Sequence, residues 1–210
     1  MLLTRGSIIL GLREMQVNIY RRKLLNATLF FARKTKHLNT TKLAKLLYFL
    51  DFDHFKQTGY PSIGLKYYTF KWGPVPKEFW LEVKDGNIPE DFEGKLIMIP
   101  VIDELDPDFK KGYEFKAISE PDLSIFTPRE KKILDWLVDV YRDAKAWQIS
   151  EVSHLPKQPW DVTIKKHGEN QPIDYLLSID EKSKIDLEEA RDSLKEHFEV
   201  VRNLGIEPTK

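Results

Sequence analysis

The stretch TTKLAKLLYFLDFDHFKQTG, residues 40–59, decides the fold. Leucines recur on one face at helical spacing, and aromatic residues cover the other faces. A helix that is apolar on every side is buried inside a domain. Asn39 or Thr40 can cap its start, and Gly59 can adopt the left-handed conformation that ends it. The sequence therefore predicts a central, buried helix.

Outward from this helix, apolar spacing predicts an amphipathic helix over residues 18–36, joined to the central one by a short link. Thr127, Pro128 and Glu130 form a strong helix start, which predicts a helix to about Arg142. Other helices are expected over residues 77–84, 147–155, 160–168 and 183–204.

Short strands are expected at about residues 65–72, 96–101 and 112–118, the last two as a hairpin or edge pair. We expect Gly73 to Pro76 to be a rigid turn that ends the first strand, because proline has no N–H to donate. The fold class is therefore mainly α with a small β element (α+β). We expect one domain over residues 1–210, with 86–126 as an acidic insertion and 183–210 as a C-terminal helix and tail.

Composition narrows the class of protein. The chain has 210 residues, of which 41% are hydrophobic and 31% charged, as in an ordinary globular domain. It has no cysteine, which excludes disulfides, a thiolate nucleophile and cysteine-ligated metal. The first residues lack the apolar run of a signal peptide, and no segment is long enough to span a membrane. We therefore expect a cytoplasmic protein without a membrane partner.

Charge is unevenly distributed along the chain, although the formal net charge is zero. Residues 1–50 contain ten Lys or Arg and a single acidic residue, Glu14, so the rest of the chain is acidic by the same amount. The basic part can meet nucleic acid, an acidic partner or the chain's own acidic half.

Two clusters invite a metal or catalytic interpretation. Asp51, Asp53 and His54 lie within one helical turn, but two ligands rarely make a metal site, and His54 fits better as a core histidine with a satisfied hydrogen bond. Ser150, Glu151, Ser153 and His154 contain the residue types of a nucleophilic site. Side chains so close on one helix point around it, so structural hydrogen bonding by His154 is favoured. The sequence predicts no catalytic residue, no metal site and no cofactor.

A third cluster combines aromatic and basic residues between positions 66 and 80. Such a cluster can anchor a protein partner, stack on single-stranded nucleic acid or pack in the core, and core packing carries the most weight. The candidate partner-binding residues are Lys66, Tyr68, Lys71, Trp72, Lys77 and Trp80.

Three segments, TKLAKLLYFLDFDHF, FKWGPVPKEFW and ISEVSHLPKQPW, in this order, resemble the Panacea domain of SocA-like antitoxins and of phage-associated proteins. The resemblance covers about residues 20–177. It rests on residues to which we give a structural role: Lys45, Leu46, Leu47, Tyr48, Gly73, Pro74, Val75, Ser153, His154 and Trp160.

The resemblance implies a mainly helical antitoxin of a toxin–antitoxin system that binds and neutralises a cognate protein toxin encoded next to it, and not an enzyme. The alternative is a DNA-binding regulator with DNA as partner. Its helix-turn-helix-like unit would combine the helix from Thr127, the short helix around Ser150 to Leu155 and the basic N-terminal portion. A hydrolase or metal-dependent enzyme that uses His54 or His154 ranks third.

Overall fold

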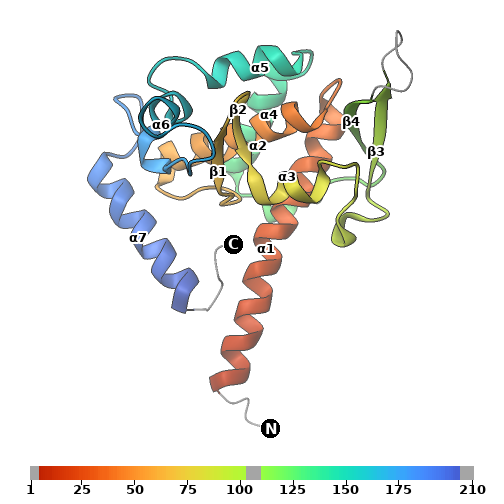
Figure 1. The fold of residues 1–210 in the computed structure, drawn as a ribbon. Helices are drawn as coiled ribbons and strands as arrows, with labels where there is room; N and C mark the ends of the chain where they lie inside the picture. Colours follow the sequence, from red (N-terminus) through yellow and green to blue (C-terminus); the bar gives the residue numbers. More distant parts are fainter. Residues whose placement is uncertain (1–4, 103–109, 204–210) are drawn as a thin grey trace.

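The structure is a computed structural model that describes residues 5–102 and 110–203. It is mainly α-helical with two small antiparallel sheets, which confirms the α+β class (Figure 1). Its helices are α1 (Arg5–Lys34), α2 (Thr40–Thr58), α3 (Lys77–Val83), α4 (Pro128–Tyr141), α5 (Ala146–Ser153), α6 (Pro159–His167) and α7 (Leu187–Asn203). Its strands are β1 (Tyr67–Phe70), β2 (Gly73–Pro76), β3 (Leu96–Ile102) and β4 (Lys110–Ala117).

Helix α2 is the predicted central helix. Its start is capped by Asn39, whose side-chain oxygen accepts a hydrogen bond of 2.9 Å from the Lys42 N–H, and Gly59 ends it with φ of 75°. Its leucines are almost completely buried, and α1, the β1–β2 hairpin, α4 and α5 all pack around it (Figure 1). The prediction of a buried helix over this stretch is confirmed.

Helix α1 begins much earlier than expected, at Arg5 rather than near residue 18. The amphipathic pattern marks the second half of the helix, where Leu24, Leu29 and Phe31 are buried in the core. The first half of α1 projects away from the body (Figure 1). No proline occurs before Pro61, so no residue of this kind interrupts the helix.

The segment Gly73 to Pro76 is strand β2, so the prediction that it is a rigid turn is wrong. It pairs antiparallel with β1, with Phe70 opposite Gly73 and Tyr67 opposite Pro76, and leaves Lys71 and Trp72 as the turn. In an antiparallel ladder alternate residues direct their N–H away from the partner strand. Pro74 and Pro76 are two apart, so both can occupy such positions on an edge strand.

Strands β3 and β4 form the second antiparallel pair, as the sequence predicts. The pair packs on the helical body: the N–H of Phe115 donates to the carbonyl oxygen of Leu38 at 2.8 Å. Phe92, Leu96 and Phe115 belong to the same core cluster as the leucines of α2. Residues 86–126 therefore contribute aromatic and aliphatic side chains to the main core, while the link 103–109 lies outside the described residues.

The basic residues near the N-terminus form ion pairs with acidic residues of the later part of the chain. Ion pairs join basic residues of α1 and the following link to acidic residues far along the chain, as in Arg21 with Glu82 and Asp91. Further pairs are Arg22 with Asp122, Lys23 with Glu130, Arg33 with Glu120 and Lys36 with Asp143. Of the three partners open to the basic segment, its own acidic half is the one that these residues meet.

Helix α7 begins at Leu187, four residues later than expected, because Asp186 accepts a hydrogen bond of 2.8 Å from the Glu189 N–H. Hydrogen bonds between Asp180 and Ser183 hold a turn before this helix.

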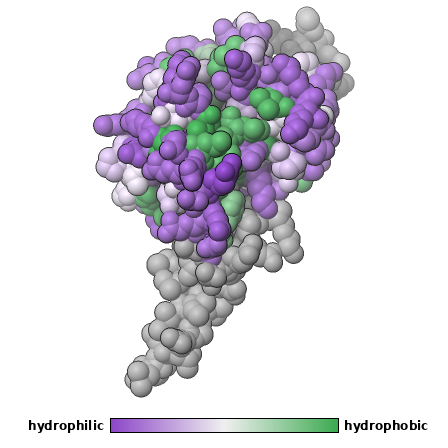
Figure 2. All heavy atoms as spheres, turned by 90° about the vertical axis from the view of Figure 1, so that its left-hand side faces the viewer, coloured by the Kyte–Doolittle hydropathy of each residue, from purple (hydrophilic) through white to green (hydrophobic). Residues whose placement is uncertain are grey.

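On the face of the molecule that α7 occupies, apolar atoms gather in the middle with hydrophilic residues around them (Figure 2). Within the described residues, none of the helices has both the length and the apolar character that a membrane span requires.

Candidate functional site: a β-hairpin surface above a buried lysine

The tip of the β1–β2 hairpin presents an exposed tryptophan. Trp72 is 68% exposed, and the ammonium group of Lys71 lies 5.1 Å from its ring centroid. The two residues form the turn between the paired strands, so no neighbouring element covers them. A large, rigid aromatic side chain that stays in solvent is a common anchor for a partner.

The outward face of the hairpin continues this aromatic and basic character onto α3. The Lys77 ammonium lies 5.2 Å from the Tyr68 ring centroid, and the rings of Phe70 and Trp80 meet edge to face at 5.6 Å. Strand alternation explains the arrangement, because Tyr67 and Thr69 point inward and are buried. We call this face the hairpin surface: Tyr68, Phe70, Lys71, Trp72, Lys77 and Trp80.

Beneath the hairpin lies Lys45 of α2, which has no exposed surface. Its Nζ donates a hydrogen bond of 3.0 Å to the carbonyl oxygen of Pro74. No carboxylate pairs with this ammonium among the described residues, so burial lowers the pKa of Lys45 to about 7. The amine is thus poised between its charged and neutral forms near neutral pH.

Gly73 allows the hairpin to approach Lys45 closely. A Cβ atom at this position would lie 2.7 Å from Lys45 Cε and 2.8 Å from both Ser153 Oγ and His154 Nε2. The φ of Gly73 is +100°, a conformation that other residues rarely adopt. Glycine is therefore required both for backbone shape and for contact, and α2, α5 and β2 meet at this point.

His154, at the end of α5, links the same region to α6. Its ring stacks on Trp160 with centroids 4.1 Å apart, and Trp160 Nε1 donates to the carbonyl oxygen of Phe70 at 3.1 Å. Burial lowers the pKa of His154, and the nearby Lys45 charge adds to the effect. The neutral imidazole is favoured, so His154 and Trp160 hold the hairpin by packing and one hydrogen bond.

Three buried polar atoms in this region make no hydrogen bond of regular geometry among the described residues: the Tyr48 hydroxyl, Ser150 Oγ and His154 Nε2. The first two belong to the facing helices α2 and α5, and the third adjoins Gly73. The backbone of Trp160 lies near the Tyr48 hydroxyl, and that of Trp72 lies near the His154 ring. Buried polar groups are normally paired. With Ser150, the polar and aromatic residues of the Panacea resemblance on α2, α5 and α6 form a set that we call the lysine cluster: Lys45, Tyr48, Ser150, Ser153, His154 and Trp160.

The geometry of α5 does not assemble a nucleophilic site. The Ser153 hydroxyl donates to the backbone carbonyl oxygen of Ser150 at 2.7 Å and not to His154. Glu151 is exposed on another face of the helix. The three residue types thus occur together without the chain of hydrogen bonds that activates a serine.

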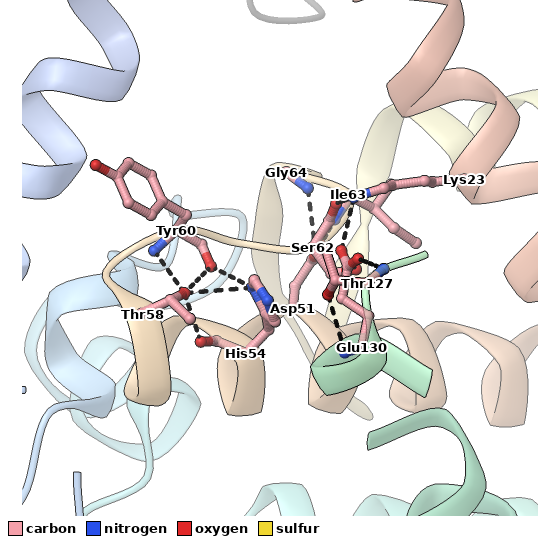
Figure 3. Close-up of polar contacts among 10 residues, drawn as sticks. All are labelled: Lys23, Asp51, His54, Thr58, Tyr60, Ser62, Ile63, Gly64, Thr127 and Glu130. Carbon is pink, nitrogen blue, oxygen red and sulfur yellow. Dashed lines mark hydrogen bonds and ion pairs between the residues drawn. The ribbon is translucent and has the colours of Figure 1, made fainter. Parts of the chain in front are cut away.

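Asp51, the other acidic candidate, is completely buried and organises the loop after α2 (Figure 3). Its carboxylate accepts hydrogen bonds from the backbone N–H groups of Ile63, Gly64 and Leu65. The Tyr67 hydroxyl donates to it as well, at 3.0 Å. The Tyr175 hydroxyl lies 3.3 Å from the carboxylate but donates its shorter hydrogen bond, of 2.6 Å, to the carbonyl oxygen of Leu65. Burial raises the pKa of Asp51, and these donors offset part of the rise.

His54 points to a different part of this loop (Figure 3). Its Nδ1 lies 2.7 Å from the carbonyl oxygen of Tyr60, which is the satisfied hydrogen bond that the sequence suggests. Asp51 and His54 therefore form hydrogen bonds with different backbone segments, Asp51 with residues 63–65 and His54 with Tyr60. Among the described residues, no group of three or more acidic or histidine side chains is arranged to hold a metal ion.

A third polar network joins α1 to α4 (Figure 3). Glu130 is buried and accepts hydrogen bonds from Lys23 Nζ at 2.6 Å, Ser62 Oγ at 2.7 Å and the Thr127 N–H at 2.7 Å. Burial alone would raise the pKa of Glu130, but these donors hold it below its usual value. The predicted capping box at Thr127 is therefore present and is also a tertiary contact.

The structure brings most of the predicted residues together. Leu46 and Leu47 are core residues of α2, Val75 is half-buried on β2, and Lys66 directly precedes β1. Sequence reasoning missed the buried Lys42, whose Nζ donates to the carbonyl oxygens of Lys36 and Arg142. The available signal was a lysine inside a helix that is otherwise apolar on every face.

The chain matches one family model, described as "Antitoxin SocA-like, Panacea domain", over residues 43–161. No curated protein and no solved structure gives a significant match to the chain. The matched range covers more than half of the 210 residues and contains α2 from Leu43 onward, the hairpin and the whole lysine cluster. The chain therefore belongs to the SocA-like antitoxin family that is defined by the Panacea domain.

Proposed function

We propose that the protein is an antitoxin that binds a cognate protein toxin directly and neutralises it, with the hairpin surface as the binding face. The observation that carries the proposal is the exposure of Trp72 at the end of a hairpin that is fixed from below. Membership of an antitoxin-like family supports the same function. Recognition, and not turnover, is the role that this geometry suits.

The hairpin is held in place before any partner arrives. Lys45 bonds the carbonyl of Pro74, Trp160 bonds the carbonyl of Phe70, and Gly73 closes on the side chains below. A partner that binds Trp72 therefore does not have to order the strands first, which removes part of the entropic cost of binding. Lys71 and Lys77 provide positive charge beside the rings and would favour an acidic rim on the toxin.

Co-expression with the product of the neighbouring gene tests the proposal. We expect the pair to purify as a complex and the antitoxin to restore growth of cells that express the toxin. The Trp72→Ala variant should lose both the complex and the rescue. Absence of a complex together with absence of rescue by the unmodified protein would contradict the proposal.

The alternative, a DNA-binding regulator, requires a recognition helix with basic side chains. In α5, the second helix of the predicted unit, the exposed residues are Trp147, Gln148 and Glu151, and no lysine or arginine occurs in Ala146–Ser153. Its other face packs on α2. Salt-sensitive binding to its own promoter, measured at about 50 mM salt, would nevertheless favour this function.

A further inference from the structure

A groove of about 680 Å³ lies between α2, the first half of α4 and the turn before α7, and none of its lining residues belongs to the hairpin surface. On α4 it is lined by Arg129, Lys132 and Trp136, which follow each other at spacings of three and four and so share one helix face. Lys182 and Lys184 line it from the turn. The volume falls in the range of small-molecule sites, about 300–1,000 Å³.

The turn that carries Lys182 and Lys184 is fixed to the end of α2. The N–H of Lys184 donates to the carbonyl oxygen of Lys56 at 3.0 Å, and Lys56 Nζ pairs with the carboxylate of Asp180 at 2.7 Å. Both contacts are made within the chain itself. The walls of the groove are therefore formed in advance, which lowers the cost of binding.

Positive charge is concentrated in the groove although the whole chain has a formal net charge of zero. In the described part of the chain, Arg129, Lys132, Lys182 and Lys184 have no carboxylate partner within ion-pair distance, whereas the basic residues of α1 are largely paired. Unpaired cations around a concave surface raise the local concentration of anions. The groove thus suits an anionic ligand.

Two further residues narrow the class of anion. Trp136 is 49% exposed and meets Tyr141 edge to face, with ring centroids 6.5 Å apart, which leaves indole surface for a flat ligand. Asp53 also lines the groove and places one carboxylate among the cations, where a neutral donor group of the ligand fits better than another anionic group. A nucleotide combines anionic phosphates with a flat base and with neutral hydroxyl or amino donors that a carboxylate can accept.

We propose that this groove binds a nucleotide, either free or as part of a single strand, with its phosphates on Arg129, Lys132, Lys182 and Lys184 and its base on Trp136. Asp53 accepts a hydrogen bond from a sugar hydroxyl or a base amino group. The site is separate from the hairpin surface. A test of nucleotide binding in the groove is therefore independent of a test of toxin binding at the hairpin surface.

The test is a titration of the full chain, followed by tryptophan fluorescence and by calorimetry, with adenosine triphosphate and with a short single-stranded oligodeoxynucleotide. Inorganic triphosphate and polyglutamate serve as anions without a base. We expect saturable quenching by at least one of the two nucleotide probes. Binding of adenosine triphosphate identifies a free nucleotide as the ligand class, and binding of the oligonucleotide alone identifies a strand.

Matched variants separate the site from general charge effects. Trp136→Leu should lose the quenching and about five- to a hundredfold in affinity, the range for stacking on one base. Trp147→Leu, an exposed tryptophan on α5, should change neither. Lys132→Ser with Lys184→Ser should weaken binding at least tenfold, whereas Lys157→Ser with Lys166→Ser, outside the groove, should not.

Three results would overturn the proposal. The first is the absence of binding by both nucleotide probes. The second is polyglutamate or triphosphate binding as tightly as the nucleotides, which would mean attraction by charge alone. The third is an equal effect of the groove variants and their controls. Thermal denaturation of each variant shows that it is folded, so a loss of binding is not mistaken for a loss of structure.

Discussion

Lys45 Nζ donates a hydrogen bond of 3.0 Å to the carbonyl oxygen of Pro74, and this contact between two buried residues fixes the hairpin to the central helix. An ammonium group in this position has lost its water and has no counter-ion among the described residues. Its protonation therefore opposes folding, while its hydrogen bond positions the proposed binding surface.

The pH dependence of stability follows from this lysine. Its pKa is about 7 in the folded chain and near the ordinary value of 10.5 in the unfolded chain. Between these values the unfolded chain binds more protons, so stability increases with pH, by at most about 1.4 kcal/mol per pH unit, and levels off above the unfolded value. Below about pH 7 the destabilisation is fully present.

The Lys45→Met variant should flatten this increase, because the titrating amine is removed. Urea denaturation at a series of pH values from 7 to 10 measures the slope. Lys71→Met, which replaces an exposed lysine of the hairpin tip, is the control and should keep the slope of the unmodified protein. Equal slopes in all three proteins would show that Lys45 does not titrate in this range.

The close approach at Gly73 predicts a large effect of a single methyl group. Gly73→Ala places Cβ within 2.8 Å of three side-chain atoms and adds strain from the positive φ. Gly94 also has a positive φ, of +70°, but has no atom within 4 Å of an added Cβ. We expect Gly94→Ala to cost about 1–2 kcal/mol in free energy of unfolding and Gly73→Ala clearly more. Similar losses of free energy of unfolding in the two variants would show that the close contacts at Gly73 do not limit the size of the side chain there.

The loop after α2 depends on the Asp51 carboxylate. Asp51→Asn replaces one acceptor oxygen by an N–H₂ group that faces other donors, so we expect a loss of about 2–4 kcal/mol in free energy of unfolding. Asp53→Asn, on the same helix, serves as the control. The Asp53 side chain receives no hydrogen bond from the backbone N–H groups of this loop, and burial raises its pKa to about 6, so its neutral form should cost little. If Asp53→Asn lowered the free energy of unfolding as much as Asp51→Asn, the hydrogen bonds of Asp51 to the loop would not explain the loss.

Trp72 should matter for binding and not for folding. Its side chain is mostly in solvent, so Trp72→Ala should change the free energy of unfolding by less than about 0.5 kcal/mol. Affinity for the toxin should fall about 30-fold or more, as expected for a hot-spot tryptophan. Trp147→Ala, on the exposed face of α5, should preserve affinity. A Trp72→Ala protein that binds normally would move the binding surface away from the hairpin.

Local patterns in the sequence were sufficient for the elements that carry their own end signals. The apolar faces of residues 40–59, the cap at Asn39 and the capping box at Thr127 are interactions between near neighbours, and all are present in the structure. Strand β2 was missed for the opposite reason. Whether a proline tolerates a strand depends on which side of it the partner lies, and only pairing with β1 decides that.

The candidate site also has a part that the sequence predicts and a part that only the structure shows. The aromatic and basic residue types between positions 66 and 80 are visible in the sequence, but burial separates them: Tyr67 and Phe79 belong to the core, whereas Trp72 is exposed. The groove lined by Arg129, Trp136 and Lys184 had no local signal, because its residues come from three segments far apart in the chain.

The sequence by itself determined the buried central helix, the α+β class and the family, because helical period, caps and motifs are local properties of the chain. The tertiary structure alone decided what the polar residues of that helix do. Lys45, Asp51 and His54 lie within ten positions of one another, yet they bond to Pro74, to the loop at Ile63 and to Tyr60. A hydrogen bond needs two atoms at about 3 Å, and which distant backbone group reaches each side chain is set only when the chain has folded.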